Sequence, residues 1–391
     1  MTIDPNSEKG KIDTDQSFFS RLREAAGTWR LLRIALKTLL LFIVVNALWL
    51  VLQPLPALES VSLYNSLVSG RVRLPYGLNA EDYNLSPTRL GTLFATHEIA
   101  RSKAEDEFRV VVLGDSSVWG ILLRPQETLT EQLNALNLIA EDGRNMHFYN
   151  LAYPMNSVLK DWYIRQKALE YQPDLIVWLV TMESLALDNQ LKPPLLLANG
   201  ETLPALMDSS GLDWDMSAVA FEETDVWDQT LVGQRQQIAD WLRLQAYGVV
   251  WSSTGIDQIY KDYTPRSNDY ETNIAWHGAL PDDATPPPYQ FDVLANPLPV
   301  PLILVNEPIY IGDGANSDLH YNAWSPRWAY DRYRSEFGIL ADQYDWTYWD
   351  AWDIIPSSEF TDSPVHLTPA GSSQLARWLS ETMQAQHIAR Q

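Results

Sequence analysis

Phe108-Arg-Val-Val-Val-Leu-Gly-Asp-Ser-Ser-Val-Trp-Gly120 contains an apolar run that stops at Gly114-Asp115-Ser116. The residues from Val110 to Leu113 are all β-branched or aliphatic, which is typical of a strand buried on both faces of a parallel sheet. Ser116 then lies at the carboxyl end of this strand. Ligands of open α/β sheets bind at that edge, because the loops there surround a crevice. The segment therefore predicts a polar site at the edge of an α/β sheet.

Strand and helix patterns alternate along most of the chain after Ser116. Further strands are predicted near Phe148 to Ala152, Leu175 to Val180, Val300 to Asn306 and Trp346 to Trp349. Helices are predicted around Glu127 to Leu138, from a cap at Ser157 to about Glu170, and from Pro369. This order predicts a three-layer αβα sandwich with a mostly parallel sheet.

The alternation stops between about 185 and 298. A Trp-rich helical stretch occupies Asp225 to Val250, and a Pro-rich stretch follows from Pro281 to Pro288. A structureless loop of that length is improbable, so we expect an inserted helical cap. This cap and the segment Asn306-Glu-Pro-Ile-Tyr310 are the expected source of substrate selectivity. Its tryptophans either stack on sugar rings or pack in the core, and core packing is the commoner role; they are Trp214, Trp227, Trp241 and Trp251.

A second polar segment, Asp362-Ser-Pro-Val-His-Leu-Thr-Pro-Ala-Gly371, lies near the end of the chain. Thr368 has the character of a helix N-cap and Pro369 that of a first helical residue. His366 should therefore project from a loop that is held at a helix start. An imidazole is the usual base that removes the proton of a serine hydroxyl, which is otherwise a poor nucleophile.

The two polar segments resemble the SGNH, or GDSL, hydrolase family, whose nucleophile lies in a Gly-Asp-Ser block and whose base lies in a C-terminal Asp-x-x-His block. The resemblance implies that Ser116 is the nucleophile and His366 the base. Asp362 is the nearest acid to orient the imidazole, but it lies four residues before His366 where the family has three. Either Asp362 serves, or Asp350 or Asp353 replaces it, or Ser116 and His366 form a dyad.

Two further family blocks, which supply donors to an oxyanion, are altered here. In Asn150-Leu-Ala-Tyr-Pro-Met-Asn-Ser157, Met155 takes the place of a glycine whose backbone N–H donates, and Asn150 opens the block. The N–H survives the exchange if the local φ is negative. In Thr181-Met-Glu-Ser184, Glu183 stands where the family has an asparagine. An ionised carboxylate would repel an oxyanion, so Thr181 and the N–H groups of Ser116 and Met155 remain the candidate donors.

The N-terminal region contains one apolar segment, residues 34–53, which is long enough to cross a bilayer as a helix. Its preceding flank is basic, so the positive-inside rule puts residues 1–33 in the cytoplasm and exports the rest; the flank holds Arg21, Arg23, Arg30, Arg33 and Lys37. A cleaved signal peptide is the alternative, but no small-x-small site follows the apolar segment. Residues 54–107 then form a lead-in, and residues 108–391 form the hydrolase-like domain.

The charge and composition of the chain limit the classes of partner and cofactor that it can bind. The first 53 residues hold seven basic and five acidic residues, which leaves 21 basic and 45 acidic residues and a net charge of −24 in the remainder. Such a charge disfavours nucleic acids. The chain has no cysteine, so it has neither disulfides nor thiolate metal sites. No metal-binding or nucleotide-binding motif is present, and we predict no cofactor.

Three functions follow from these observations. The first is a membrane-anchored, extracytoplasmic serine hydrolase that cleaves an acyl ester through an acyl-Ser116 intermediate. The second, which the resemblance also implies, is an O-acyltransferase that passes the acyl group to an envelope glycan. The third is a degenerate envelope protein that binds a glycan or a protein partner, a reading that Met155 and Glu183 favour. The sequence does not indicate an oligomeric state.

Overall fold

The computed structural model describes residues 9–68, 70–77, 84–200, 202–214, 221, 225–258, 289–314 and 317–391, and of residues 9–27 only the backbone. The Pro-rich stretch from Pro281 to Pro288 lies outside the described residues. The chain divides into two compact units. One comprises Met1–Leu55 and Thr224–Ile238, and the other comprises Pro56–Glu223 and Ala239–Gln391.

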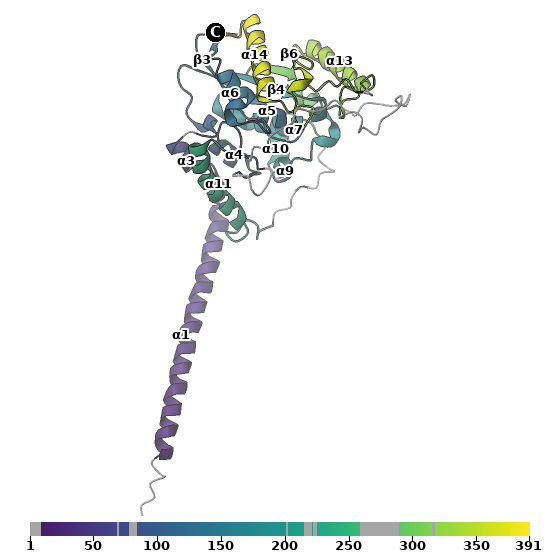
Figure 1. Cartoon of the computed structure of the whole chain (residues 1–391). Coiled ribbons are helices and arrows are strands. Elements are labelled where there is room, and N and C mark those ends of the chain that lie inside the picture. The colour runs from purple at the N-terminus through teal and green to yellow at the C-terminus, as the bar shows by residue number, and fades with distance from the viewer. Residues whose placement is uncertain are drawn as a thin grey trace, which may run out of the picture. The chain divides into compact units, whose positions relative to one another are not determined.

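A seven-stranded sheet in the order β6-β5-β4-β1-β3-β2-β7 forms the centre of the larger unit (Figure 1). The five strands from β6 to β3 are parallel, and the short strands β2 and β7 pair antiparallel at one edge. The strands are β1 (Glu107–Leu113), β2 (Ile139–Ala140), β3 (Asn145–Asn150), β4 (Leu175–Val180), β5 (Leu302–Asn306), β6 (Thr347–Asp350) and β7 (Ala389–Arg390).

Helices cover both faces of this sheet. Val111 and Leu113 of β1 pack in one apolar cluster with side chains of α7 (Val158–Ala168) and α13 (Arg327–Tyr344). Val110 and Val112 point to the opposite face, into a cluster with α6 (Leu129–Asn134) and α14 (Pro369–Ala385). The side chains of a strand alternate between the two faces of its sheet, so an all-apolar strand requires a helical layer on each side. The fold is the predicted three-layer αβα sandwich.

The strand order places the end of β1 at a reversal in the winding of the chain. From β1 the chain passes to β3 on one side, and then to β4 on the other side of β1. Ligand crevices in open α/β sheets form at such a reversal, beyond the carboxyl ends of the strands. Ser116, three residues after β1, lies at this point.

The predicted strands and helices of the sandwich agree with the structure to within a few residues, with one informative exception. The helix predicted around Glu127 to Leu138 is confined to α6, and Ile139 then pairs with Asn145 and Arg390 in strand β2. Tertiary pairing here overrides the local leucine periodicity. Strands of two residues such as β2 and β7 leave no periodic pattern in a sequence.

Short helices fill the two regions outside the sandwich. Before β1 lie α2 (Leu55–Glu59), α3 (Leu63–Leu67) and α4 (Leu90–Thr96). Between β4 and β5 lie α8 (Met182–Leu185), α9 (Pro194–Leu197), α10 (Leu203–Ser209), α11 (Arg235–Thr254) and α12 (Asp292–Ala295). Trp251 is buried, and Trp241 and Trp214 are partly buried, whereas Trp227 is exposed.

The smaller unit is built on helix α1 (Lys9–Leu52). Its part from Thr28 to Leu52 is long and apolar enough to cross a membrane. Polar side chains at its carboxyl end bind the segment around residue 232. The Asn46 Oδ1 accepts from the Val232 N–H at 3.1 Å, and the Trp49 Nε1 donates to Gln234 Oε1 at 2.7 Å. This end of the helix therefore packs against protein.

Buried Arg73 fixes the turn that follows Ser116. Its guanidinium donates to the carbonyl oxygens of Gly120 at 2.7 Å and Leu123 at 3.1 Å. It also pairs with Asp257 at 2.7 Å, and these two side chains are 1% and 2% exposed. Gly120 has a φ of 89°, a conformation that favours glycine.

We expect Asp257→Ala to lower the free energy of unfolding by about 3–5 kcal/mol, because it removes a buried carboxylate that pairs with the buried guanidinium of Arg73. Urea unfolding of the full chain in detergent measures the effect. Asp240→Ala is the matched control, since Asp240 pairs with Arg243 at the surface, and it should cost less than about 1 kcal/mol. Equal effects of the two substitutions would contradict the prediction.

Candidate active site

The turn between β1 and α5 (Ser116–Trp119) positions Ser116. Asp115 caps this helix, its side chain accepting from the Ser117 N–H at 2.9 Å. Gly114 allows the strand and the helix to approach closely, since a Cβ there would lie 2.6 Å from Val118 Cγ2. Ser116 is half-buried at the first position of the helix.

A closed loop positions His366. An antiparallel bridge joins Phe360 to Leu367, and the Thr361 N–H donates to the His366 carbonyl oxygen at 2.9 Å. Thr368 caps α14 as predicted, its side chain accepting from the Gly371 N–H at 3.0 Å. The residues from 361 to 366 therefore form a tight loop whose two ends are pinned.

The structure brings Ser116, His366 and Asp362 into one hydrogen-bonded chain. Ser116 Oγ lies 2.8 Å from His366 Nε2, and His366 Nδ1 lies 2.8 Å from Asp362 Oδ1. The hydrogen bond from His366 holds the pKa of Asp362 below its usual value, so this carboxylate is ionised and can only accept. The proton between them must then reside on Nδ1, and in the neutral imidazole Nε2 can accept from the Ser116 hydroxyl.

Asp362 is the acid that this geometry selects from the three that the sequence leaves open. The closed loop places it beside the imidazole although it lies four residues before His366, with Ser363, Pro364 and Val365 buried between them. Asp350 instead pairs with Arg334 at 2.6 Å. Asp353 is exposed. The catalytic roles of the three hydrogen-bonded residues are part of the proposal below.

Met155 adopts a backbone conformation that favours glycine. Its φ is 86°, so the condition of a negative φ, on which the sequence argument relied, is not met. A residue with a Cβ is strained in this region of φ, by about 1 kcal/mol or more. The main chain at this position thus keeps the form suited to glycine while carrying a half-buried methionine side chain.

Thr181 and Asn150 have structural partners. Thr181 caps α8 in a reciprocal pair with Ser184, its N–H donating to Ser184 Oγ at 3.0 Å and its Oγ1 accepting from the Ser184 N–H at 3.1 Å. The buried amide of Asn150 donates to the Val118 carbonyl oxygen at 2.9 Å and ties β3 to α5. Neither polar group is brought to the hydrogen-bonded chain of Ser116. The pKa of Glu183 is raised by burial, which favours the neutral acid over a carboxylate that would repel an oxyanion.

Glu307 is a residue of the site that the sequence argument missed. It directly follows β5, is 2% exposed, and accepts a hydrogen bond from the Ser117 hydroxyl. Burial, and then the nearby charge of Asp115, raise its pKa well above the usual value. The two adjacent serines therefore face different partners, since Ser116 meets an imidazole and Ser117 meets a buried carboxyl group whose pKa is raised. A signal was available in the sequence, because Glu307 is an acid at the end of an apolar strand.

Lys160 of α7 connects the two loops beside Ser116. Its fully buried ammonium donates to the Gly114 carbonyl oxygen at 3.1 Å and to the Tyr153 carbonyl oxygen. It also pairs with Asp161 at 2.7 Å, and burial raises the pKa of that carboxyl to about 7. This one cation thus fixes the turn before Ser116 and the loop that carries Met155.

Two small cavities, each of about 10 Å³, border the loop of His366. One is lined by Ser117, Glu307 and Val365, among others. The other is lined by Glu183, Val365 and the exposed Trp324, among others. Each has room for about one water molecule. Within the described residues, no group of three or more His, Asp or Glu side chains is placed to hold a metal ion.

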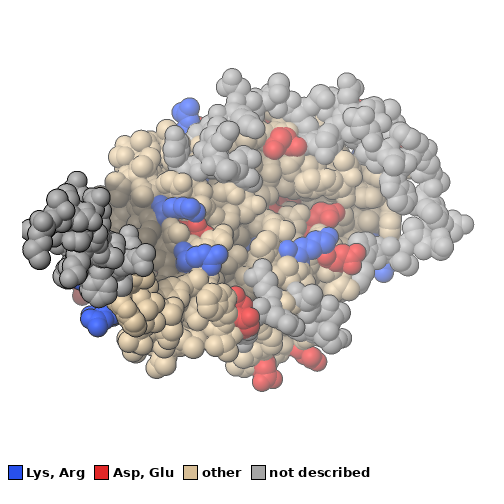
Figure 2. Space-filling view, turned by 90° about the horizontal axis from the view of Figure 1, so that it is seen from below, with Lys and Arg blue, Asp and Glu red and all other residues tan. Residues whose placement is uncertain are grey.

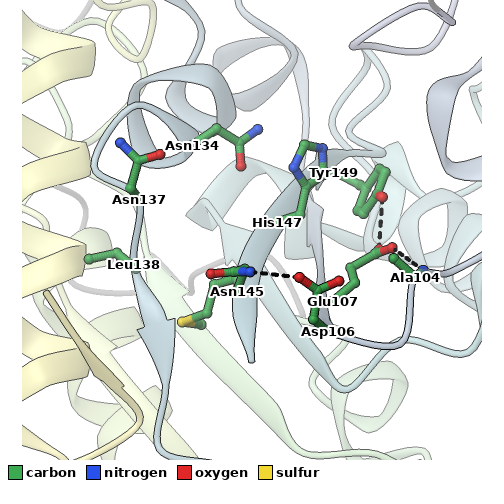
Figure 3. A pocket seen from close by; sticks show the side chains of 10 residues that line it. Ala104, Asp106, Glu107, Asn134, Asn137, Leu138, Asn145, His147 and Tyr149 are labelled. Carbon is green, nitrogen blue, oxygen red and sulfur yellow. Dashed lines mark hydrogen bonds between the residues drawn. The ribbon is translucent and has the colours of Figure 1, made fainter. Parts of the chain in front are cut away.

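A larger polar hollow, of about 340 Å³, lies at the start of β1 and β3, where residues including Glu107, His147 and Tyr149 line it (Figure 3). Several of its side chains bind one another. The Tyr149 hydroxyl donates to Glu107 at 2.8 Å, and the Asn145 amide donates to Asp106 at 3.0 Å. The hollow lies at the amino ends of these strands, the edge of the sheet opposite to Ser116.

No protein-family model matches the chain. No curated protein matches it either. Among solved structures, a carbohydrate acetylesterase family member from Sinorhizobium meliloti is 12% identical, with a TM-score of 0.33, over 71% of this chain and 97% of that one. A putative lipolytic protein of the G-D-S-L family from Desulfitobacterium hafniense is 11% identical, with a TM-score of 0.30, over 70% and 98%.

An acetylxylan esterase from Geobacillus stearothermophilus, solved as a catalytic mutant, is 10% identical, with a TM-score of 0.30, over 72% of this chain and 94% of that one. The chain is thus similar to acetylesterases and to a protein of the G-D-S-L family.

We expect Met155→Gly to be more stable than Met155→Ala by about 1 kcal/mol, because alanine keeps the strain of a positive φ and glycine removes it. The comparison with alanine separates strain from the loss of the methionine side chain, which both variants share. Urea unfolding measures the difference. Equal stability of the two variants would mean that the backbone here carries no strain.

We expect Glu307→Gln to change how stability depends on pH. The folded-state pKa of Glu307 is raised, so its contribution to stability is present below the unfolded-state pKa of about 4.3 and is lost as the pH rises through the folded-state value. Glutamine cannot ionise, so the melting temperature of the variant should rise relative to wild type as the pH increases above about 4.3.

The control for this measurement is Glu381→Gln, which changes an exposed glutamate. Its melting temperature should stay at a constant offset from wild type over the same pH range. The prediction fails if Glu307→Gln shows the same constant offset.

Proposed function

We propose that this chain is a membrane-anchored serine hydrolase that cleaves an acyl ester through an acyl-Ser116 intermediate. The hydrogen-bonded chain from Ser116 through His366 to Asp362, with both heavy-atom distances at 2.8 Å, is the observation that carries the proposal. A serine, an imidazole and an ionised carboxylate in this order are the parts of a nucleophilic triad, which is recognised by geometry and not by sequence position.

The reaction proceeds in two halves. Ser116 Oγ attacks the ester carbonyl carbon while His366 Nε2 takes the hydroxyl proton. The tetrahedral intermediate expels the alcohol oxygen, which receives that proton from His366, and the acyl group stays on Ser116. Water then attacks the acyl carbon, again giving its proton to Nε2, and the acid leaves as Ser116 regains the proton. Asp362 stabilises the imidazolium of each half-reaction.

The oxyanion needs donors at the end of β1. The Ser116 N–H is at the first position of α5, where a helix has no internal acceptor for it. The φ of Met155 is positive, so the main chain keeps the form suited to glycine, and on that ground its N–H, in the loop that Lys160 ties to Gly114, is the candidate second donor. With the asparagine position taken by Glu183, the site has one donor fewer than the family pattern. A missing donor typically costs about 10²–10³ in turnover, so we propose a slow hydrolase.

The acyl group is short in this proposal. The two cavities that border the loop of His366 hold about 10 Å³ each, which excludes a long acyl chain from both. An acetyl group needs space for only one methyl group beyond the carbonyl carbon. Trp324, 40% exposed in the lining of one cavity, offers an apolar ring to the alcohol part of the ester.

The location follows from helix α1. The apolar part from Thr28 to Leu52 acts as an uncleaved anchor, and its basic flank keeps the N-terminus in the cytoplasm. The proposal retains the division into a cytoplasmic segment 1–33, an anchor 34–53, a lead-in 54–107 and an extracytoplasmic domain 108–391 with a helical insertion at about 185–298.

Fluorophosphonate labelling of the full chain in detergent tests the nucleophile. We expect labelling of the wild type, none in Ser116→Ala, and none or almost none in His366→Ala. Asp362→Asn should slow labelling by up to about 10⁴-fold, because the imidazole loses its orienting charge. Ser117→Ala is the matched control and should keep the label. A folded wild type that stays unlabelled would favour a degenerate binding protein.

Ester length tests the substrate class. p-Nitrophenyl acetate should be hydrolysed faster than the octanoate by the wild type, and neither should be hydrolysed by Ser116→Ala. A preference for octanoate would contradict the short acyl group while leaving the nucleophile intact. Acetylated acceptor accumulating in place of free acetate, when a glycan is added, would instead identify an O-acyltransferase.

A further inference from the structure

Many of the exposed apolar side chains described in the larger unit lie on or beside two segments, while others, such as Ile339 at 61%, lie elsewhere. Four of them are Leu67 at 84%, Leu63 at 58%, Val249 at 56% and Leu242 at 55%. These belong to α3 and α11. We call this surface the α3/α11 face and define it by its exposed residues: Leu58, Val61, Leu63, Leu67, Val68, Leu242, Val249, Val250 and Ile256.

The two helices of this face pack against each other. The Leu63 N–H donates to Gln245 Oε1 at 2.8 Å, and Trp241 Nε1 donates to the Val61 carbonyl oxygen at 3.1 Å. Gly248 lies against the Tyr64 ring, since a Cβ there would come within 2.2 Å of it. The inner sides of both helices are thereby occupied, and the exposed apolar residues form their outer side.

On α11 the outer residues follow a helical period. Leu242, Ala246 and Val249 are spaced by four and three residues, and all three are exposed. An apolar stripe of this kind normally faces a core. Contiguous exposed apolar surface marks a binding surface for a protein or a membrane.

The charge of this face distinguishes it from the rest of the domain. The remainder of the chain beyond residue 53 has a net charge of −24, yet α2 and α3 contain one acid, Glu59, which is buried. On α11, Asp240 is neutralised by Arg243 at 2.8 Å. In the view from below, Lys and Arg side chains (blue) and Asp and Glu side chains (red) are scattered among tan residues (Figure 2). An uncharged surface enters a lipid headgroup region at little electrostatic cost.

A short segment joins this face to the apolar helix. Helix α1 ends at Leu52, α2 begins at Leu55, and α3 begins at Leu63, so ten residues lie between the end of the apolar helix and α3. A face tethered this closely to a membrane anchor is within reach of the membrane interface. A second copy or a soluble partner has no such tether.

We infer that the α3/α11 face lies in the membrane interface, with Leu63, Leu67, Leu242 and Val249 inserted among the lipid headgroups and upper acyl chains. This inference rests on the proposed membrane anchor. The occupant of the face is the lipid bilayer, bound by burial of apolar surface. Trp241, whose indole lies between α11 and Val61, is a residue type that favours this depth.

The absence of cysteine in the chain makes the test direct. Single-cysteine variants of the full chain, Leu63→Cys, Leu67→Cys and Val249→Cys, are labelled with bimane and reconstituted in phosphatidylcholine vesicles. Doxyl groups near the top of the acyl chains should quench the fluorescence at all three positions, and aqueous iodide should not. Ile339→Cys on α13, which is 61% exposed, is the matched control and should show the reverse.

A variant in the anchor separates the two proposals. Leu40→Cys, at an exposed position of the apolar helix, should be quenched by doxyl groups deep in the acyl chains. If Leu40 is quenched by lipid while the face is quenched by iodide, the inference is overturned and the anchor stands. If the face is protected from both quenchers, a protein covers it, and the inference is overturned as well. Loss of lipid quenching at Leu40 too would overturn the anchor together with the inference.

Discussion

The buried ammonium of Lys160 is the interaction on which the crevice depends. It donates to the Gly114 and Tyr153 carbonyl oxygens, and so joins the turn before Ser116 to the loop of Met155. A cation without water is costly unless it is paired, and Asp161 at 2.7 Å provides the pair. Two further buried carboxyls, Asp115 and Glu307, lie near this pair. Burial beside these groups raises the pKa of Glu307 well above its usual value, which favours its neutral form.

The two neighbouring serines, Ser116 and Ser117, have different hydrogen-bond partners. The Ser116 hydroxyl meets Nε2 of His366, which accepts a proton because Nδ1 is committed to Asp362. The Ser117 hydroxyl meets Glu307, whose pKa is raised by burial, which favours its protonated form. The same short turn therefore presents one serine beside an imidazole and one beside a buried carboxyl group. Asp362 lies four residues before His366, one more than in the family motif. The bridge between Phe360 and Leu367 closes the loop so that Asp362 still lies beside the imidazole.

The sequence was sufficient for the sheet because its strands are buried on both faces and are apolar throughout, as Val110 to Leu113 and Leu175 to Val180 are. It was also sufficient to single out Ser116 and His366, because both lie beside signals of helix starts. It was insufficient for features that depend on distant contacts. The edge strand at Ile139 exists only through pairing with Asn145 and Arg390. The φ of Met155 and the burial of Glu307 are set by the packing of loops from different strands, and no local pattern predicts them.

The acidic composition and the apolar α3/α11 face are two parts of one arrangement. A domain with a net charge of −24 is repelled by anionic lipids at every surface where the charge is exposed. The residues of the face are the exception, since Glu59 is buried and Asp240 is paired with Arg243. Repulsion of the charged surfaces by anionic lipids and burial of the apolar residues of the α3/α11 face would both favour turning this face to the bilayer. Under the proposed anchor and membrane contact, this distribution of charge and apolar surface would select one orientation toward the bilayer, and the substrate would reach Ser116 in that orientation.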